Sequence, residues 1–190
     1  MRTMNTITLA LIGLMSGLMP GPASAQTPPA ASGPAKTAVE ITKADIEAAA
    51  KIGLAALRPG VNVSDRNISL ADIGAYNVTV AFVTRPATKV QSGNALSHDT
   101  ITEIYYIVRG TGTQVTGTLV DAIKATGSKT IGPGTSSTKP ITGGRTMTLG
   151  PGEMQIIPPG LGHVWTEIGD GGIDYMVIRI DPEHVLAISK

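Results

Sequence analysis

Three residues of this chain have side chains that suit a metal ion and lie in or beside strand-like segments. His98 and Glu103 fall within "LSHDTITEIYYIVRG", and His163 follows a stiff corner in "GEMQIIPPGLGHVWTE". A buried, isolated carboxylate takes up a proton, pairs with a cation or binds a metal. Two neutral imidazoles beside it favour a divalent ion such as Zn, Mn or Fe, with open positions for a substrate or O2. The residue types therefore predict a metal site, provided that the fold brings them together.

An arrangement without a metal is also consistent with these residues. His98 and His163 can hydrogen-bond a Glu103 that is either neutral or paired with a buried arginine. Arg85 and Arg179 are the candidates for that cation. The sequence leaves this alternative open beside the metal site.

The corner before His163 is built to restrict the backbone. Pro158 and Pro159 fix φ and remove two backbone donors. Gly160 and Gly162 permit conformations that other residues resist. We expect the corner to aim the imidazole inward, the alternative being an ordinary hairpin turn with an exposed histidine.

Four further residues are predicted to line the pocket around the three ligands. The argument is strand parity, since alternate side chains of a strand face the same side. Packing in the core is the alternative role, and it is the favoured one for Tyr105 and Met154. The predicted pocket-lining residues are Leu96, Tyr105, Met154 and Trp165.

The elements that must position these residues are mostly strands. Segments such as "NVTVAFVT", "TEIYYIVRG" and "IDYMVIRI" are β-branched and alternating, and Gly, Pro, Asn or Asp separates them. One amphipathic helix is predicted at about 43–57, within 41–60, with Thr42 and Asp45 as a capping pair. The stretch 121–145 is rich in Gly, Ser and Thr and predicts a long loop. The pattern indicates an all-β antiparallel sandwich or barrel.

At the candidate ligands the sequence resembles the cupin superfamily. One cupin motif has the form G-x5-H-x-H-x3-4-E-x6-G, and another has the form G-x5-P-x-G-x2-H-x3-N. The resemblance covers about 93–167 by motif and 64–181 by strand pattern. The matching residues are His98, Glu103 and Gly110 for the first motif and Gly152, Pro158, Gly160 and His163 for the second.

Two positions depart from the cupin motifs. Leu96 stands where the first motif has a histidine, and Glu167 stands where the second has an asparagine. The usual four ligands are thereby reduced to the three named above. The resemblance implies a single cupin-type barrel or jelly roll over 61–185, with one N-terminal α-helix, and a possible homodimer.

The resemblance also implies two classes of function. One is a metal-dependent enzyme acting on a small oxygen-bearing organic molecule, by oxygenase, lyase or isomerase chemistry. The other is a non-catalytic module that binds a small ligand in the periplasm. Leucine in place of the first histidine mildly favours the second class.

The N-terminal residues predict export. An apolar run from Ile7 to Met19 precedes Ala23-Ser24-Ala25, which is a cleavage pattern, so 1–25 is expected to be a signal peptide. Residues 26–40 are expected to be a disordered linker. The mature chain is predicted to be periplasmic or secreted, without disulfides because it has no Cys. No basic run indicates nucleic acid, and the short apolar run predicts no stable membrane association.

Overall fold

A computed structural model of the chain describes residues 34 and 37–189. The predicted signal peptide, 1–25, and most of the predicted linker, 26–40, lie outside the described residues. The described part contains one helix, α1 (Lys43–Ala56), followed by antiparallel strands. The strands are β1 (Ser64–Asp72), β2 (Asn77–Arg85), β3 (Ala95–His98), β4 (Thr102–Thr118), β5 (Ile123–Ser128), β6 (Gly132–Ser137), β7 (Thr142–Leu149), β8 (Met154–Ile157) and β9 (Gly162–Asp181).

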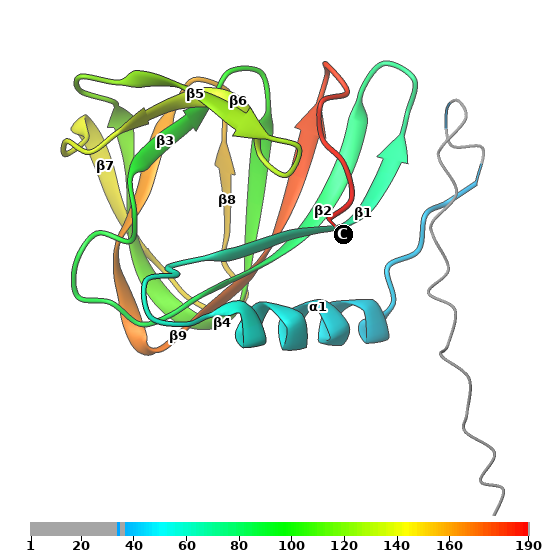
Figure 1. Ribbon diagram of the computed structural model, residues 1–190, viewed down its shortest axis with the longest axis horizontal. Helices are drawn as coiled ribbons and strands as arrows, with labels where there is room; N and C mark the ends of the chain where they lie inside the picture. Colours follow the sequence, from blue (N-terminus) through cyan, green and yellow to red (C-terminus); the bar gives the residue numbers. More distant parts are fainter. Residues whose placement is uncertain (1–33, 35–36, 190) are drawn as a thin grey trace, which may run out of the picture. The chain divides into compact units, whose positions relative to one another are not determined.

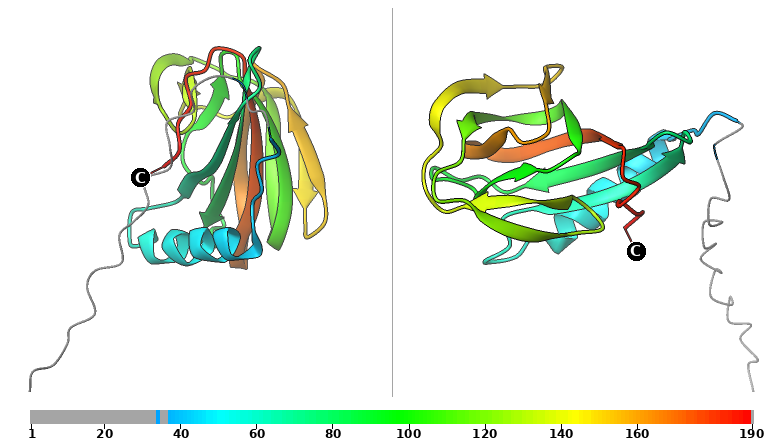
Figure 2. Two further views of the ribbon diagram at one scale, coloured as in Figure 1. Left: turned by 90° about the vertical axis from the view of Figure 1, so that its right-hand side faces the viewer. Right: turned by 90° about the horizontal axis from the view of Figure 1, so that it is seen from above.

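The helix α1 begins at a capping box and lies against β1 and β2 (Figures 1 and 2). The side chain of Thr42 accepts a hydrogen bond from the Asp45 N–H at 3.2 Å, and the Asp45 carboxylate accepts one from the Thr42 N–H at 2.9 Å. A Cβ at Gly53 would lie 3.0 Å from Oγ1 of Thr84, so the glycine permits close packing on the sheet. The helix lies where the sequence predicted it. In the described part, no helix has the length and apolar character needed to cross a bilayer.

All the strands belong to one sheet that curls on itself (Figure 1). Its order is β1-β2-β9-β3-β6-β5, and β4 pairs with β7, β8 and β9. The C-terminal half of β9 pairs with β2 and the first half of β4, whereas its N-terminal half pairs with β3 and the second half of β4. Because β4 and β9 contribute to both halves of the curled sheet, side chains from both halves face a common interior.

Glycine allows β4 and β9 to bend where the two halves meet. In the register, Gly110 pairs with Ile173 and Gly112 pairs with Ile168, so β9 has additional residues at this point. Gly110 has a φ of 77°, and a Cβ there would lie 1.9 Å from the carbonyl oxygen of Gly172. No other residue fits this position without a backbone shift.

The prediction of a long loop over 121–145 is wrong. This stretch contains β5, β6 and the start of β7, and β6 pairs with β3 beside the candidate site. A Cβ at Gly134 would lie 1.9 Å from the carbonyl oxygen of Ser97, so close backbone approach explains at least one of its glycines. The strands are formed by backbone ladders that the composition does not reveal.

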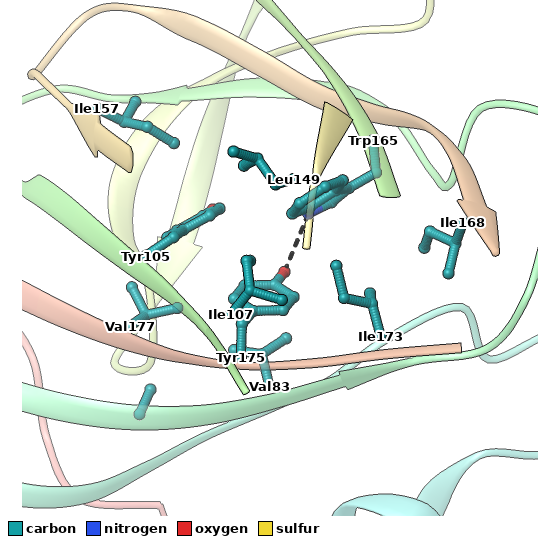
Figure 3. Close-up of a cluster of buried hydrophobic side chains, with 11 residues drawn as sticks. Val83, Tyr105, Ile107, Leu149, Ile157, Trp165, Ile168, Ile173, Tyr175 and Val177 are labelled. Carbon is teal, nitrogen blue, oxygen red and sulfur yellow. Dashed lines mark hydrogen bonds between the residues drawn. The ribbon is translucent and has the colours of Figure 1, made fainter. Parts of the chain in front are cut away.

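The interior is filled by apolar and aromatic side chains (Figure 3). The rings of Tyr105 and Tyr175 have centroids 4.8 Å apart, and those of Trp165 and Tyr175 lie 5.6 Å apart. These rings belong to the core and also line the cavity beside the polar residues described next. The core cluster comprises Ala81, Val83, Tyr105, Ile107, Leu149, Ile157, Trp165, Ile168, Ile173, Tyr175 and Val177.

Candidate metal centre

The structure brings the three predicted ligands together in the interior. His98 is the last residue of β3, Glu103 lies near the start of β4, and His163 lies near the start of β9. Nε2 of His98 lies 3.3 Å from Oε2 of Glu103, and Nε2 of His163 lies 3.4 Å from the same oxygen. All three side chains are buried, and one ligand atom from each lies within 4.8 Å of the others.

The Pro-Pro-Gly corner positions both histidines. The Gly160 N–H donates a hydrogen bond to the carbonyl of His98 at 2.7 Å, so the corner is attached to β3. Gly160 has a φ of 76°, which glycine adopts readily. The first residues of β9 then place His163 opposite Leu96 of β3. The expectation that the corner directs His163 inward agrees with this geometry.

Arg179 supplies a cation at the same carboxylate. It lies directly opposite Glu103 in the β4–β9 register, and its Nε donates to Oε1 of Glu103 at 2.8 Å. Its Nη1 and Nη2 donate to the two carboxylate oxygens of Asp65 at 3.1 and 2.6 Å. Nη1 also donates to Oδ1 of Asn67 at 2.8 Å. The ion pair proposed as the alternative to a metal is therefore present, with Arg179 rather than Arg85 as the cation.

Asp65 and Asn67 were not identified from the sequence as part of this site. They lie two residues apart on β1, so their side chains face the same side of the strand. The signal that could have found them is the placing of an acid and an amide two positions apart in "SDRNIS". Asn67 also donates to the carbonyls of Thr130 and Ala187 at 3.0 and 2.9 Å, which attaches the β5–β6 turn and the C-terminal segment to the site.

The surroundings of Glu103 favour its ionised form. Burial raises the pKa of this carboxyl, but His98 and Arg179, together with hydrogen bonds from both histidines, hold the pKa well below its usual range. Burial and the nearby Glu103 charge raise the pKa of Tyr105 well above its usual value, so its hydroxyl stays protonated. This hydroxyl donates to Oε2 of Glu103 at 2.9 Å.

The donor set fits a divalent ion. Nδ1 of His163 lies 3.2 Å from the carbonyl of Leu161, so a proton on Nδ1 is donated there, and Nε2 faces Glu103 either as a hydrogen-bond donor or, without its proton, as a metal ligand. Nε2 and Oε2 of Glu103 lie 3.4 Å apart, and either a proton on Nε2 or a cation between the two atoms makes this contact favourable. Ligands bonded at about 2.0–2.2 Å to one ion are separated by roughly the spacings found here. Arg179 occupies Oε1 and leaves Oε2 on the side of the imidazoles.

A small cavity of about 40 Å³ adjoins these residues. Leu96, Tyr105 and Trp165 line it, as predicted from strand parity. The prediction for Met154 is wrong, because Met154 is 58% exposed and points outward from β8. The inward residues of that strand are Gln155 and Ile157, so the predicted alternation of inward and outward side chains was wrong by one residue.

Comparison with known proteins gave structural neighbours only. No protein-family model matches the chain, and no curated protein matches it. Among solved structures, it is similar to a double-stranded β-helix protein from Klebsiella pneumoniae, with 13% identity, 70% of this chain and 90% of that chain covered, and a TM-score of 0.42. KdgF from Halomonas sp. has 11% identity, 67% and 86% coverage and a TM-score of 0.40. A cupin-2 domain protein from Shewanella frigidimarina has 18% identity, 60% and 78% coverage and a TM-score of 0.33.

The decisive observation is internal to the chain. The antiparallel sheet curls so that the glutamate of one cupin motif and the histidine of the other meet in its interior. The fold is of the cupin type. In this chain the position of the first motif histidine is Leu96, which lines the cavity, and Glu167 is an exposed residue paired with Lys89 at 3.2 Å. The third histidine, His184, is exposed and hydrogen-bonded to Asn77 at 3.0 Å.

Proposed function

We propose that this cupin binds one divalent metal ion through His98, Glu103 and His163. The observation that carries the proposal is the convergence of three buried ligand atoms within 4.8 Å beside a cavity. Two imidazoles and one carboxylate suit Zn, Mn or Fe and leave coordination positions open. When bound, such an ion supplies a Lewis acid or an O2-binding centre.

The surrounding residues have separate roles in this proposal. Arg179 holds Oε1 of Glu103, so the carboxylate presents Oε2 to the histidines and cannot rotate freely. The Tyr105 hydroxyl donates to that same oxygen and fixes its orientation. Leu96 offers no ligand atom and keeps the neighbouring position apolar. The chain would thus act on a small oxygen-bearing molecule as an enzyme whose reaction is of oxygenase, lyase or isomerase type.

A second candidate function is a non-catalytic module that binds a small ligand. The observation that favours it is the ion pair between Arg179 and Glu103, at 2.8 Å, which neutralises the carboxylate without a metal. In this case the histidines would hydrogen-bond the carboxylate and the cavity would bind its ligand through polar contacts alone.

We further propose that the mature chain is exported and forms a homodimer through its outer sheet face. This face is defined by Tyr106, Val108, Met154 and Ile156, which are each at least 40% exposed. Tyr106 pairs with Met154 across β4 and β8, so the side chains are contiguous. None of the four is charged, so an identical face can meet it without like-charge repulsion.

The proposed function is tested by metal stoichiometry. The parent, purified without chelator from metal-replete growth, should hold about one divalent ion per chain by elemental analysis. His163→Ala should lose most of this metal and melt at a lower temperature, whereas Leu96→His should retain it more tightly. His184→Ala is the matched control, because that histidine lies at the surface and should change neither quantity. A parent without divalent metal, together with a His163→Ala variant that melts like the parent, would refute the metal site and leave the binding module.

A further inference from the structure

A second arginine opens onto the cavity without a carboxylate partner. Arg85 is half-buried at the end of β2 and lines the same cavity as His98 and His163. Its Nε donates to the Tyr175 hydroxyl at 2.9 Å, and its Nη1 donates to Oγ of Ser92 at 3.2 Å. Among the residues that the structure describes, no Asp or Glu forms an ion pair with it, and Nη2 has no hydrogen-bond acceptor.

The Tyr175 hydroxyl is a second donor without an acceptor. It accepts hydrogen bonds from Nε of Arg85 at 2.9 Å and from Nε1 of Trp165 at 3.2 Å (Figure 3). Its own proton has no acceptor in the part of the chain that the structure describes. The side chain is only 1% exposed and lines the cavity. A buried donor without a partner carries a free-energy cost that a ligand oxygen would relieve.

The charges around the cavity also favour an anion. The lining holds two arginines, Arg85 and Arg179, and two acids, Asp65 and Glu103. Both acids are paired with Arg179, which leaves Arg85 as the cation without a direct partner. With neutral histidines these charges balance, so the divalent ion of the proposed function would give the cavity a net charge of about +2. An anionic ligand restores the balance.

We infer that the cavity binds a small carboxylate anion, held by Nη2 of Arg85 and the hydroxyl of Tyr175 with its other end toward the histidines. The arginine supplies the charge-assisted bonds, and the tyrosine supplies a donor of fixed direction. A cavity of about 40 Å³ corresponds to roughly three water positions at about 10–15 Å³ each. That space accommodates formate and excludes an aromatic acid. The inference rests on the proposed function for the role of the metal, and it narrows the substrate class to small carboxylates.

The test is the dissociation constant for formate, measured by isothermal titration calorimetry on the full mature chain. Formate should bind the parent, and benzoate should not. Arg85→Met and Tyr175→Phe should each raise the formate dissociation constant. The arginine variant should raise it by at least about tenfold, because a hydrogen bond to a charged group contributes at least that factor to affinity. Arg109→Met is the matched control, because Arg109 is exposed and pairs with Asp174 at 2.7 Å outside the cavity lining.

The metal content of every sample separates this inference from the proposed function. Unchanged metal content with weakened formate binding in both cavity variants supports the inference. Formate binding that is equally tight in the parent and in Arg85→Met overturns it, because the metal or another group would then be the anion site. A parent that holds metal but binds no formate also overturns it and leaves the metal site standing. Loss of metal from the parent itself counts against the proposed function alone.

Discussion

Removing the cation at the centre of the site is the sharpest test of the electrostatic reasoning. Arg179 is almost fully buried, with 2% of its side chain exposed, and it pairs with Glu103 at 2.8 Å and Asp65 at 2.6 Å. Arg179→Met keeps most of the apolar stem but leaves two carboxylates without their shared partner. In the metal-free protein Glu103 then keeps only His98, His163 and Tyr105 as partners among the described residues.

The expected loss of folding stability in Arg179→Met is large and depends on pH. Removing one partner of a buried ion pair costs about 3–5 kcal/mol, which is a fall in melting temperature of about 6–20 °C for a domain of this size. In the parent, the lowered pKa of Glu103 gives a contribution that is complete above its unfolded pKa and is lost only as pH falls through the folded value. Without Arg179, only the histidines oppose the effect of burial and the pKa of Glu103 rises, so the variant loses less stability than the parent as pH falls.

The assay is urea unfolding of parent and variant with a chelator, at pH 7 and at pH 5. The difference in unfolding free energy should be about 3–5 kcal/mol at pH 7 and smaller at pH 5. Lys89→Met serves as control, because its ion pairs with Glu167 and Asp170 are exposed and contribute at most about 1 kcal/mol. A variant within about 1 kcal/mol of the parent at pH 7, or a loss that does not change with pH, would refute the assigned network.

Two further predictions concern the bend and the outer face. Gly110→Ala should cost at least about 3 kcal/mol in urea unfolding, because it adds left-handed strain to a clash with the carbonyl of Gly172. Gly152→Ala, with a similar φ of 86° but open space, should cost only about 1–2 kcal/mol, and equal losses would contradict the close approach. Met154→Lys combined with Ile156→Lys should convert the proposed dimer to a monomer in light scattering, and a parent that is already monomeric would contradict the dimer.

The site ligands could be predicted because their spacing is fixed locally. His163 follows a corner whose prolines and glycines restrict the backbone, and Glu103 lies on a strand with clear alternation. Apolar alternation also sufficed to predict an antiparallel barrel, because its strands have one face in the core. These features are readable from short segments.

The remaining features depend on contacts between distant segments. Arg179 and Glu103 are 76 residues apart, and only the β4–β9 register places them opposite each other. The strands within 121–145 have few apolar side chains, so their pairing with β3 leaves little trace in the composition. Met154 was assigned to the wrong face because β8 has only four residues, and a displacement of one residue reverses every side chain.

The long strand β9 has a consequence for how the chain folds. The start of β9 brings His163 and its end brings Arg179 to the same carboxylate, that of Glu103. Asp65, which is 114 residues before Arg179, pairs with this arginine from β1. A partly folded chain with β4 and β9 paired but β1 absent would bury an arginine with only half of its counter-charge. Such an intermediate is costly, so these strands should dock in a single cooperative step. Folding should accordingly be slow, since its decisive contacts are all distant in sequence.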